Sequence, residues 1–353
     1  MQVSRPGAVL SGLLVSGVLA AACSAGSALP ATTTTPSRTV VTRTSTSSVP
    51  APTDLSTTST TKGSSRPSTR QARLVPLPPP APLRPFAGSG GQGVWHPAGR
   101  LVQGHPAVYE TTLVPPGSSS AAGIAWMDPH LLRAQLYSGS SSPGGTGWKY
   151  TAPVLPAAAR SLVAAFNGGF KFPATEGGYY SEGRLVYPLR VGGASFVIYR
   201  DGTATVGQWG RDVHMTNQVV AVRQNLTLLV DHGHAVAGLN PGDTSVWGAP
   251  LGGVPDVWRS GVGVTKDGAL VYVTGPRLEI TQLAALLVRA GCVRAMTLDM
   301  NPDWTVFATY RPPTATGQAA PSNGSDLVPG TVQGPYTFFE AWWARDFFTM
   351  SAR

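Results

Sequence analysis

The pattern of apolar and polar residues changes near Gly91 and predicts where the folded part of the chain begins. Beyond it, short apolar runs alternate with Gly, Pro, Asp and Asn, as in β-strands separated by turns. Asp201-Gly202 follows one such run and Asp267-Gly268 joins two others, which indicates tight hairpins. The runs that predict strands span residues 123–127, 132–137, 162–166, 195–199, 219–222, 226–230, 261–265, 269–273 and 293–298.

One segment late in the chain has the periodicity of an amphipathic helix instead. Thr281 is suited to cap its start and Gly291 to end it. Its apolar residues recur at helical spacing as Leu283, Leu286, Leu287 and Ala290. The sequence therefore predicts an α+β fold of β-rich mixed sheets with a few packed helices, in a single domain over residues 91–353.

The N-terminus has the three-part layout of a secretory signal over residues 1–22. A basic start is followed by an apolar run at residues 8–22, which is shorter than the roughly 20 residues of a membrane-spanning helix. Cys23 follows at once, in a sequence that resembles a bacterial lipobox whose cysteine becomes lipidated. We expect an outward-facing protein anchored to the cell membrane by lipid; plain secretion and a retained N-terminal anchor are the alternatives.

Residues 23–90 are rich in Ser, Thr and Pro and are predicted to be a disordered stalk. Residues 1–90 contain eight Lys or Arg and one acid, giving +7, whereas residues 91–353 contain eighteen and sixteen, giving +2. The basic tail favours either an anionic membrane surface or a solvated spacer. The nearly neutral domain argues against nucleic-acid binding.

Several candidate ligand-binding residues lie where predicted strands begin or end. The glycines of Asn167-Gly168-Gly169 allow close approach of backbone N–H groups to a ligand, although an ordinary turn has the same composition. Arg259 precedes a strand, and its guanidinium suits phosphate or carboxylate, or else a surface ion pair.

A second group follows the predicted 293–298 strand. Asp299, Asn301 and Asp303 beside Trp304 have the chemistry to hold a sugar, or they form an Asx-Pro turn. Their oxygens also suit a hard divalent cation such as calcium. Further carboxylates are Glu182, in a Gly- and Tyr-rich segment that also reads as a hairpin, and Asp128.

Three motifs in this order resemble the phosphodiester glycosidase family, which hydrolyses sugar-phosphate bonds. They are Asn167-Gly168-Gly169-Phe170, the segment from Arg259 to Gly268, and the segment from Leu283 to Asp299. The resemblance implies that Asn167, Gly168 and Gly169 form a ligand loop, that Arg259 contacts phosphate and that Asp299 is the catalytic carboxylate. The chain departs from the family after Asp299, where Met300-Asn301-Pro302 replaces a glycine-rich run.

The resemblance and the signal together predict an exported hydrolase that cleaves a sugar 1-phosphodiester in envelope glycans or glycolipids. The alternative is a non-catalytic envelope lipoprotein of the same fold that binds glycans or assists assembly. The altered turn after Asp299 motivates this alternative, because Pro302 lacks the N–H that a glycine would offer.

Overall fold

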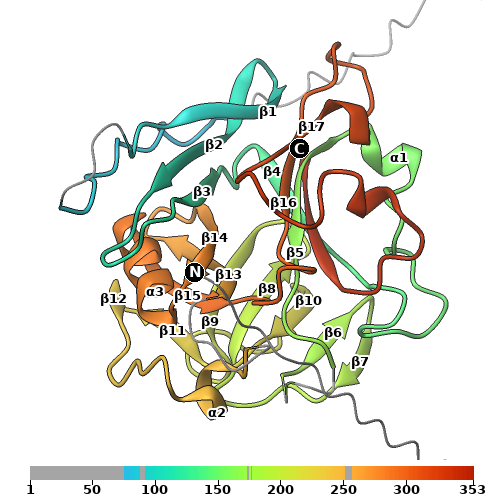
Figure 1. Cartoon of the computed structure of the whole chain (residues 1–353). Coiled ribbons are helices and arrows are strands. Elements are labelled where there is room, and N and C mark those ends of the chain that lie inside the picture. The colour runs from blue at the N-terminus through green and yellow to red at the C-terminus, as the bar shows by residue number, and fades with distance from the viewer. Residues whose placement is uncertain (1–74, 88–91, 173–174, 176, 251–256) are drawn as a thin grey trace, which may run out of the picture. The chain divides into compact units, whose positions relative to one another are not determined.

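The computed structural model describes residues 75–87, 92–172, 175, 177–250 and 257–353. The predicted signal peptide and Cys23 lie outside these residues, as does most of the predicted stalk. The described residues belong to one compact unit, drawn in Figure 1. No helix in the described part of the chain has the length and apolar character needed to cross a membrane.

The unit contains three β-sheets (Figure 1). The large sheet has eight strands in the order β1 (His96–Val102), β2 (His105–Leu113), β3 (Ala122–Met127), β14 (Leu270–Leu278), β13 (Val257–Thr265), β15 (Cys292–Thr297), β11 (Leu228–Asp231) and β12 (His234–Ala235). The second sheet has five strands in the order β7 (Arg184–Tyr187), β6 (Tyr179–Ser181), β10 (Val219–Gln224), β8 (Ala194–Tyr199) and β9 (Ala204–Gln208). The third has five in the order β17 (Gly324–Asp326), β16 (Phe307–Tyr310), β5 (Leu162–Asn167), β18 (Phe347–Ala352) and β4 (Leu132–Tyr137).

The prediction of a β-rich fold with few helices is confirmed, whereas the prediction of mixed sheets is wrong. Neighbouring strands in the described sheets pair antiparallel. The physical reason is the connections, since adjacent parallel strands need a crossover, whereas β8–β9 and β13–β14 are joined by short turns at the predicted Asp-Gly pairs. The β14–α3–β15 connection does cross over, but β13 lies between its two strands.

Helix α3 (Ile280–Arg289) covers one face of the large sheet (Figure 1). Glu279, rather than the predicted Thr281, caps its start, and Gly291 follows its end with a φ of 87°. A Cβ on Gly261 of β13 would lie 3.2 Å from Leu287 and 3.3 Å from Leu283. A glycine there therefore lets the helix approach the sheet closely. The other described helices are short: α1 (Pro156–Ala159), α2 (Thr244–Trp247) and the 3₁₀ turns Pro321–Asn323 and Thr337–Phe339.

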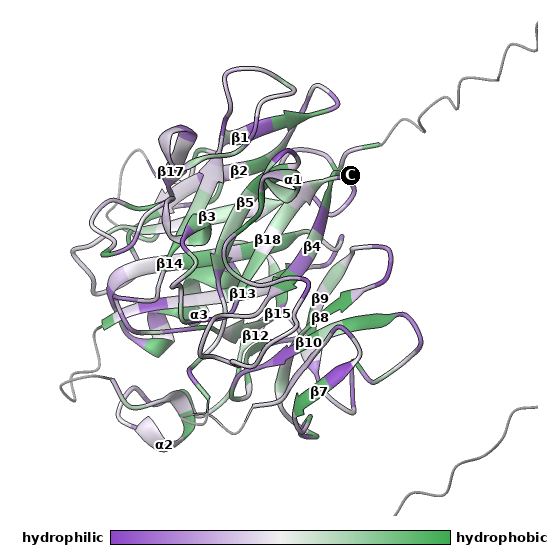
Figure 2. Ribbon diagram, turned by 90° about the vertical axis from the view of Figure 1, so that its right-hand side faces the viewer, coloured by the Kyte–Doolittle hydropathy of each residue, from purple (hydrophilic) through white to green (hydrophobic). Residues whose placement is uncertain are grey.

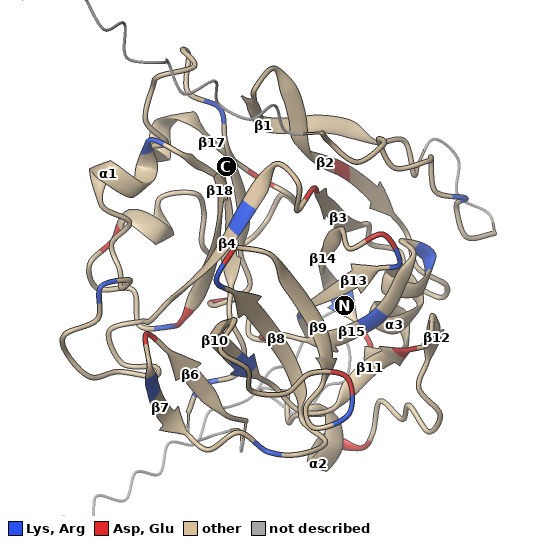
Figure 3. Ribbon diagram, turned by 180° about the vertical axis from the view of Figure 1, so that it is seen from behind, with Lys and Arg blue, Asp and Glu red and all other residues tan. Residues whose placement is uncertain are grey.

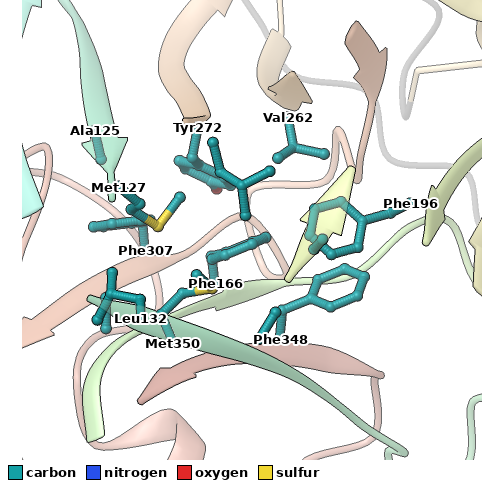
Figure 4. Packing of buried hydrophobic residues seen from close by; sticks show 14 of the residues in the cluster. Ala125, Met127, Leu132, Phe166, Phe196, Val262, Tyr272, Phe307, Phe348 and Met350 are labelled. Atoms are coloured by element: carbon teal, nitrogen blue, oxygen red, sulfur yellow. The ribbon is translucent and has the colours of Figure 1, made fainter. Parts of the chain in front are cut away.

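The three sheets meet around a cluster of buried aromatic residues (Figure 4). Phe166 of β5 lies 5.2 Å from both Phe348 of β18 and Tyr272 of β14, measured between ring centroids. Phe196 of β8 lies 4.4 Å from Phe348 and brings in the second sheet. Apolar colouring is accordingly concentrated on the central strands (Figure 2), while charged residues of both signs are spread over loops and strand ends (Figure 3).

Residues 75–87 pack on this unit as an extended segment, so its described part begins before the predicted boundary at residue 91. The Leu77 N–H donates to Asp128 Oδ2 at 2.8 Å, and Trp95 Nε1 donates to the Ala81 carbonyl at 2.9 Å. Arg289 at the end of α3 donates to the Arg84 carbonyl at 2.6 Å. The predicted stalk therefore has a C-terminal part that contacts the domain.

Candidate active site

A cavity of about 590 Å³ opens beside the start of β13 and the segment that follows β15. Strand ends of the large and third sheets converge there, which brings together segments far apart in sequence. Its lining residues are Phe170, Lys171, Gly248, Ala249, Val257, Trp258, Pro276, Arg277, Asp299, Met300, Asn301, Pro302, Trp304 and Arg345. Asp299 is the single carboxylate among these residues, beside three cationic and three aromatic side chains.

Asp299 is held in place by three segments. Its Oδ2 lies 2.5 Å from Arg345 Nη2, and its Oδ1 accepts the Asn301 N–H at 2.9 Å. Its carbonyl accepts the N–H and the hydroxyl of Ser260 at 3.0 and 2.8 Å, which ties it to β13. Burial raises the pKa of Asp299, and the Arg345 guanidinium opposes this shift.

Arg345 precedes β18 and connects the acid to the glycine loop. Its Nη2 also donates to the Gly169 carbonyl at 3.0 Å, and its guanidinium carbon lies 5.2 Å from the centroid of Trp304. The side chain is 6% exposed. A guanidinium and a carboxylate therefore share this pocket. The guanidinium is that of Arg345 and not that of Arg259, which was predicted.

The predicted phosphate contact, Arg259, lies beside the cavity rather than on its wall. It is 1% exposed and is not among the lining residues. Its Nε donates to the Leu278 carbonyl at 2.8 Å, and burial lowers its pKa to about 10. The alternation of side chains along β13 explains this placement, since Arg259 and Gly261 share a face and Gly261 faces α3.

The predicted ligand loop, Asn167 to Gly169, is largely engaged with the protein itself. Asn167 is 1% exposed; its Oδ1 accepts from the Tyr272 hydroxyl at 2.7 Å and its Nδ2 donates to Ser260 Oγ at 3.0 Å. A Cβ on Gly168 would collide with the Asp346 carboxylate. The two glycines therefore make room for buried charged side chains, and Phe170, which follows them, is the loop residue that reaches the cavity with Lys171.

Those charged side chains form a second buried ion pair. Arg223 Nε lies 2.8 Å from Asp346 Oδ2, and both side chains are fully buried. Arg223 also donates to the carbonyls of Phe170 and Gln224. A Cβ on Gly169 would lie 3.0 Å from the Arg223 guanidinium. This pair fixes the backbone that positions Phe170 at the cavity wall.

The turn after Asp299 is stabilised by Asx-type bonds, in agreement with one of its two interpretations. The Asp303 N–H donates to Asn301 Oδ1 at 2.9 Å. Asn301 and Trp304 line the cavity, whereas Asp303 is exposed and does not.

The predicted cation site at Asp299, Asn301 and Asp303 does not fit this geometry. The side-chain oxygens of Asp299 and Asn301 are occupied by N–H donors, and the Arg345 guanidinium already neutralises Asp299. No group of three His, Cys, Asp or Glu side chains within the described ranges is arranged to hold a metal ion.

The two further carboxylates do not line the cavity. Glu182 occupies the turn between β6 and β7, where it accepts the N–H groups of Lys149 and Tyr150 at 2.9 and 2.8 Å. The hairpin interpretation of this segment is confirmed. Asp128 instead accepts the N–H groups of Leu77 and His130.

Arg345 and Asp346 were not predicted as parts of the site, whereas the polar stretch from Arg223 to Asn225 is open, from its sequence, to interpretation as a turn or as part of the site. Arg345 and Asp346 stand between the aromatic pairs Trp342-Trp343 and Phe347-Phe348. Arg223 follows four apolar residues near the end of β10. Charges inside apolar segments were the available signal, because such charges are buried only when paired.

The fold and the site define a β-rich domain with a paired carboxylate and guanidinium in an aromatic-lined pocket. Residues 160–318 match the model of the phosphodiester glycosidase family, so the predicted resemblance is confirmed. The matched segment includes Asn167, Arg259 and Asp299, whereas Arg345 lies beyond its end. No curated protein matches the chain.

Among solved structures, the chain is similar to the catalytic domain of zebrafish N-acetylglucosamine-1-phosphodiester alpha-N-acetylglucosaminidase, described as auto-inhibited by its pro-peptide. The identity is 15% and the TM-score 0.41, over 74% of this chain and 88% of that one. A hypothetical protein from Synechocystis has 11% identity and a TM-score of 0.41, over 73% and 64%. A putative exported protein from Burkholderia pseudomallei has 13% identity and a TM-score of 0.30, over 65% and 74%.

Proposed function

We propose that this protein is an exported hydrolase that cleaves a sugar 1-phosphodiester, the bond between an anomeric carbon and phosphate, in envelope glycans or glycolipids. The observation that carries the proposal is the pocket, in which Asp299 is paired with Arg345 beneath aromatic walls. The family match over residues 160–318 supports the reaction class.

The chemistry requires little more than this pocket contains. Hydrolysis breaks the bond between the anomeric carbon and the bridging phosphate oxygen, and water supplies the hydroxyl that remains on the sugar. The phosphate monoester leaves as a stable anion, so protonation of the leaving group matters less than in ordinary glycoside hydrolysis. Asp299 either stabilises or attacks the carbon as positive charge develops there.

The remaining walls suit a sugar that carries phosphate. Phe170, Trp258 and Trp304 offer aromatic faces against which the apolar face of a sugar ring can pack. Lys171 and Arg277 add positive charge beside Arg345, giving the lining three cations against one acid. A phosphodiester would therefore be drawn to this cavity in preference to a neutral sugar.

Export is supported by the sequence. The signal-like residues 1–22, Cys23 and the basic Ser/Thr/Pro-rich segment are typical of a lipid-anchored protein held away from the membrane by a spacer. We therefore place the substrate among envelope glycans or glycolipids.

The test is release of free sugar from sugar 1-phosphodiesters by the purified full-length chain. Asp299→Asn should lower kcat/KM at least about a hundredfold, because it removes the charge while keeping the shape. Asp267→Asn is the matched control, an exposed acid in the β13–β14 turn that should leave activity unchanged. Lack of turnover on every such substrate, or full activity in Asp299→Asn, would refute the proposal.

A non-catalytic glycan-binding role is the second candidate, favoured by one observation. Both oxygens of Asp299 are engaged, by Arg345 and by the Asn301 N–H, and Pro302 offers no N–H to a ligand. Saturable binding of envelope glycans with no detectable hydrolysis would favour this role, and product release that depends on Asp299 would exclude it.

A further inference from the structure

The guanidinium of Arg345 is incompletely satisfied although it is buried. Its Nη2 donates two hydrogen bonds, to Asp299 Oδ2 and to the Gly169 carbonyl. Its Nε is buried and has no hydrogen-bond partner among the residues that the structure describes. A buried N–H without an acceptor is costly and calls for an explanation. Because Arg345 lines the cavity, a ligand is a natural source of the missing acceptor.

The same guanidinium also restrains the only carboxylate of the described lining. A carboxylate 2.5 Å from a guanidinium nitrogen is stabilised as an ion-pair partner and is correspondingly less available to a substrate. The acid of the pocket is thus paired with a cation that would also attract an anionic ligand.

We propose that Arg345 is the anion-binding residue of the pocket, and that a phosphate group replaces Asp299 as the partner of its guanidinium. The identity of the anion as phosphate rests on the proposed function. The existence of an anion site at Arg345 does not depend on whether the protein is an enzyme. Binding of the phosphate then releases Asp299 at the moment when the sugar is in place.

The surroundings allow this transfer. The planar guanidinium fork matches two phosphate oxygens, and Arg345 lies close enough to the Trp304 ring for the indole to hold its plane. The bond from Nη2 to Gly169 ties the guanidinium to the loop that Arg223 and Asp346 fix. Lys171 and Arg277, also on the lining, add to the attraction for an anionic phosphate group.

The competing explanation is that Arg345 serves only to clamp Gly169 to Asp299. The two explanations differ in what removing the Asp299 charge does to anion affinity. If phosphate and Asp299 compete for one guanidinium, phosphate binds more tightly without the acid. If Arg345 is a clamp only, phosphate does not bind there at all.

In the experiment, the full-length chain is titrated with inorganic phosphate. Binding is measured by calorimetry and by tryptophan fluorescence. Asp299→Asn should tighten phosphate binding about five- to tenfold, because the competing charge is lost. Arg345→Lys should weaken binding about tenfold or more, since an ammonium lacks the bidentate fork. Arg133→Lys, an exposed arginine of β4 outside the lining, is the matched control and should bind as the wild type does.

Several outcomes would overturn the inference. Failure of both the wild type and Asp299→Asn to bind phosphate would do so, even if Arg345→Lys failed to fold. Weaker rather than tighter binding in Asp299→Asn would do so too, because it would make Asp299 a support of the site and not a competitor.

The outcome of the phosphate titration can be distinguished from the outcome of the hydrolysis assay. Phosphate binding with the expected pattern of variants but no hydrolysis would leave the anion site standing and refute the enzyme. Hydrolysis inhibited by phosphate equally in wild type and Arg345→Lys would do the reverse.

Discussion

Glu110 gives the fold a pH dependence that can be worked out from its position. It lies on β2, where its carboxyl is near Thr309 and Arg311 of the third sheet and the segment that follows β16. Its Oε1 is buried without a hydrogen-bond partner among the described residues. Burial raises the pKa of this carboxyl from its ordinary 4.5 to about 7, and the contacts with Thr309 and Arg311 only partly offset that.

The sign follows from proton binding. Between pH 4.5 and 7 the folded protein keeps a proton on Glu110 that the unfolded chain releases, so folding becomes less favourable as the pH rises through this window. A pKa that rises from 4.5 to about 7 corresponds to a loss on the order of 3 kcal/mol, fully present above pH 7 and absent below 4.5. The Glu110→Gln variant, which cannot ionise, should escape this loss.

The assay is urea unfolding of wild type and Glu110→Gln at several pH values from 4.5 to 8. We expect the free energy of unfolding of the variant to rise relative to that of the wild type as the pH rises. Between pH 4.5 and 8 this relative change should amount to about 3 kcal/mol. Glu340→Gln, a change at a carboxylate that accepts an exposed hydrogen bond from Trp342 Nε1, is the control for general effects of charge. A difference between Glu110→Gln and wild type that stays constant across this range would refute the reasoning.

Three further predictions concern the site. Asp346→Asn should lower the free energy of unfolding by about 3–5 kcal/mol, because it leaves the Arg223 charge buried and unpaired. Urea unfolding measures this loss, and a loss below about 1 kcal/mol would contradict the prediction. Gly168→Ala should destabilise the fold by forcing Asp346 to move, whereas Gly242→Ala should not, because a Cβ there would meet nothing closer than Asn240 Oδ1 at 3.4 Å. Equal melting temperatures for the two variants would count against the described packing. Trp304→Ala should raise the KM for a sugar phosphodiester about tenfold in steady-state kinetics, because an aromatic wall is lost, and an unchanged KM would place the sugar elsewhere.

Local sequence was sufficient for much of the secondary structure. The strand predicted at residues 132–137 is β4, and the Asp-Gly pairs at 201–202 and 267–268 form the turns that follow β8 and β13. These features depend on neighbouring residues, since alternation and a glycine at positive φ act within a few positions. Strands β1 and β2 were not predicted, because Pro97, Gly99 and Pro106 interrupt their apolar pattern.

The sequence also identified Asp299, since a carboxylate directly after an apolar strand is a local signal. It did not identify Arg345, the guanidinium that pairs with Asp299. Arg259 has the right chemistry, but packing of α3 on its strand decides that it faces the helix and the Leu278 carbonyl. Arg345 and Asp346 reach the glycine loop because β18 pairs with β5 in a register that sets Phe347 opposite Asn167.

By itself, then, the sequence determined the β-rich character, the hairpins, the α3 helix, the resemblance to phosphodiester glycosidases and the acid of the pocket. The tertiary structure alone decided which charges meet. Pairing of strands separated by 180 positions and the face that a strand presents to its neighbours are set by the whole core. No local sequence pattern predicts this pairing or this choice of face. The alternation of side chains defines the two faces of a strand but not which face is covered by the rest of the protein.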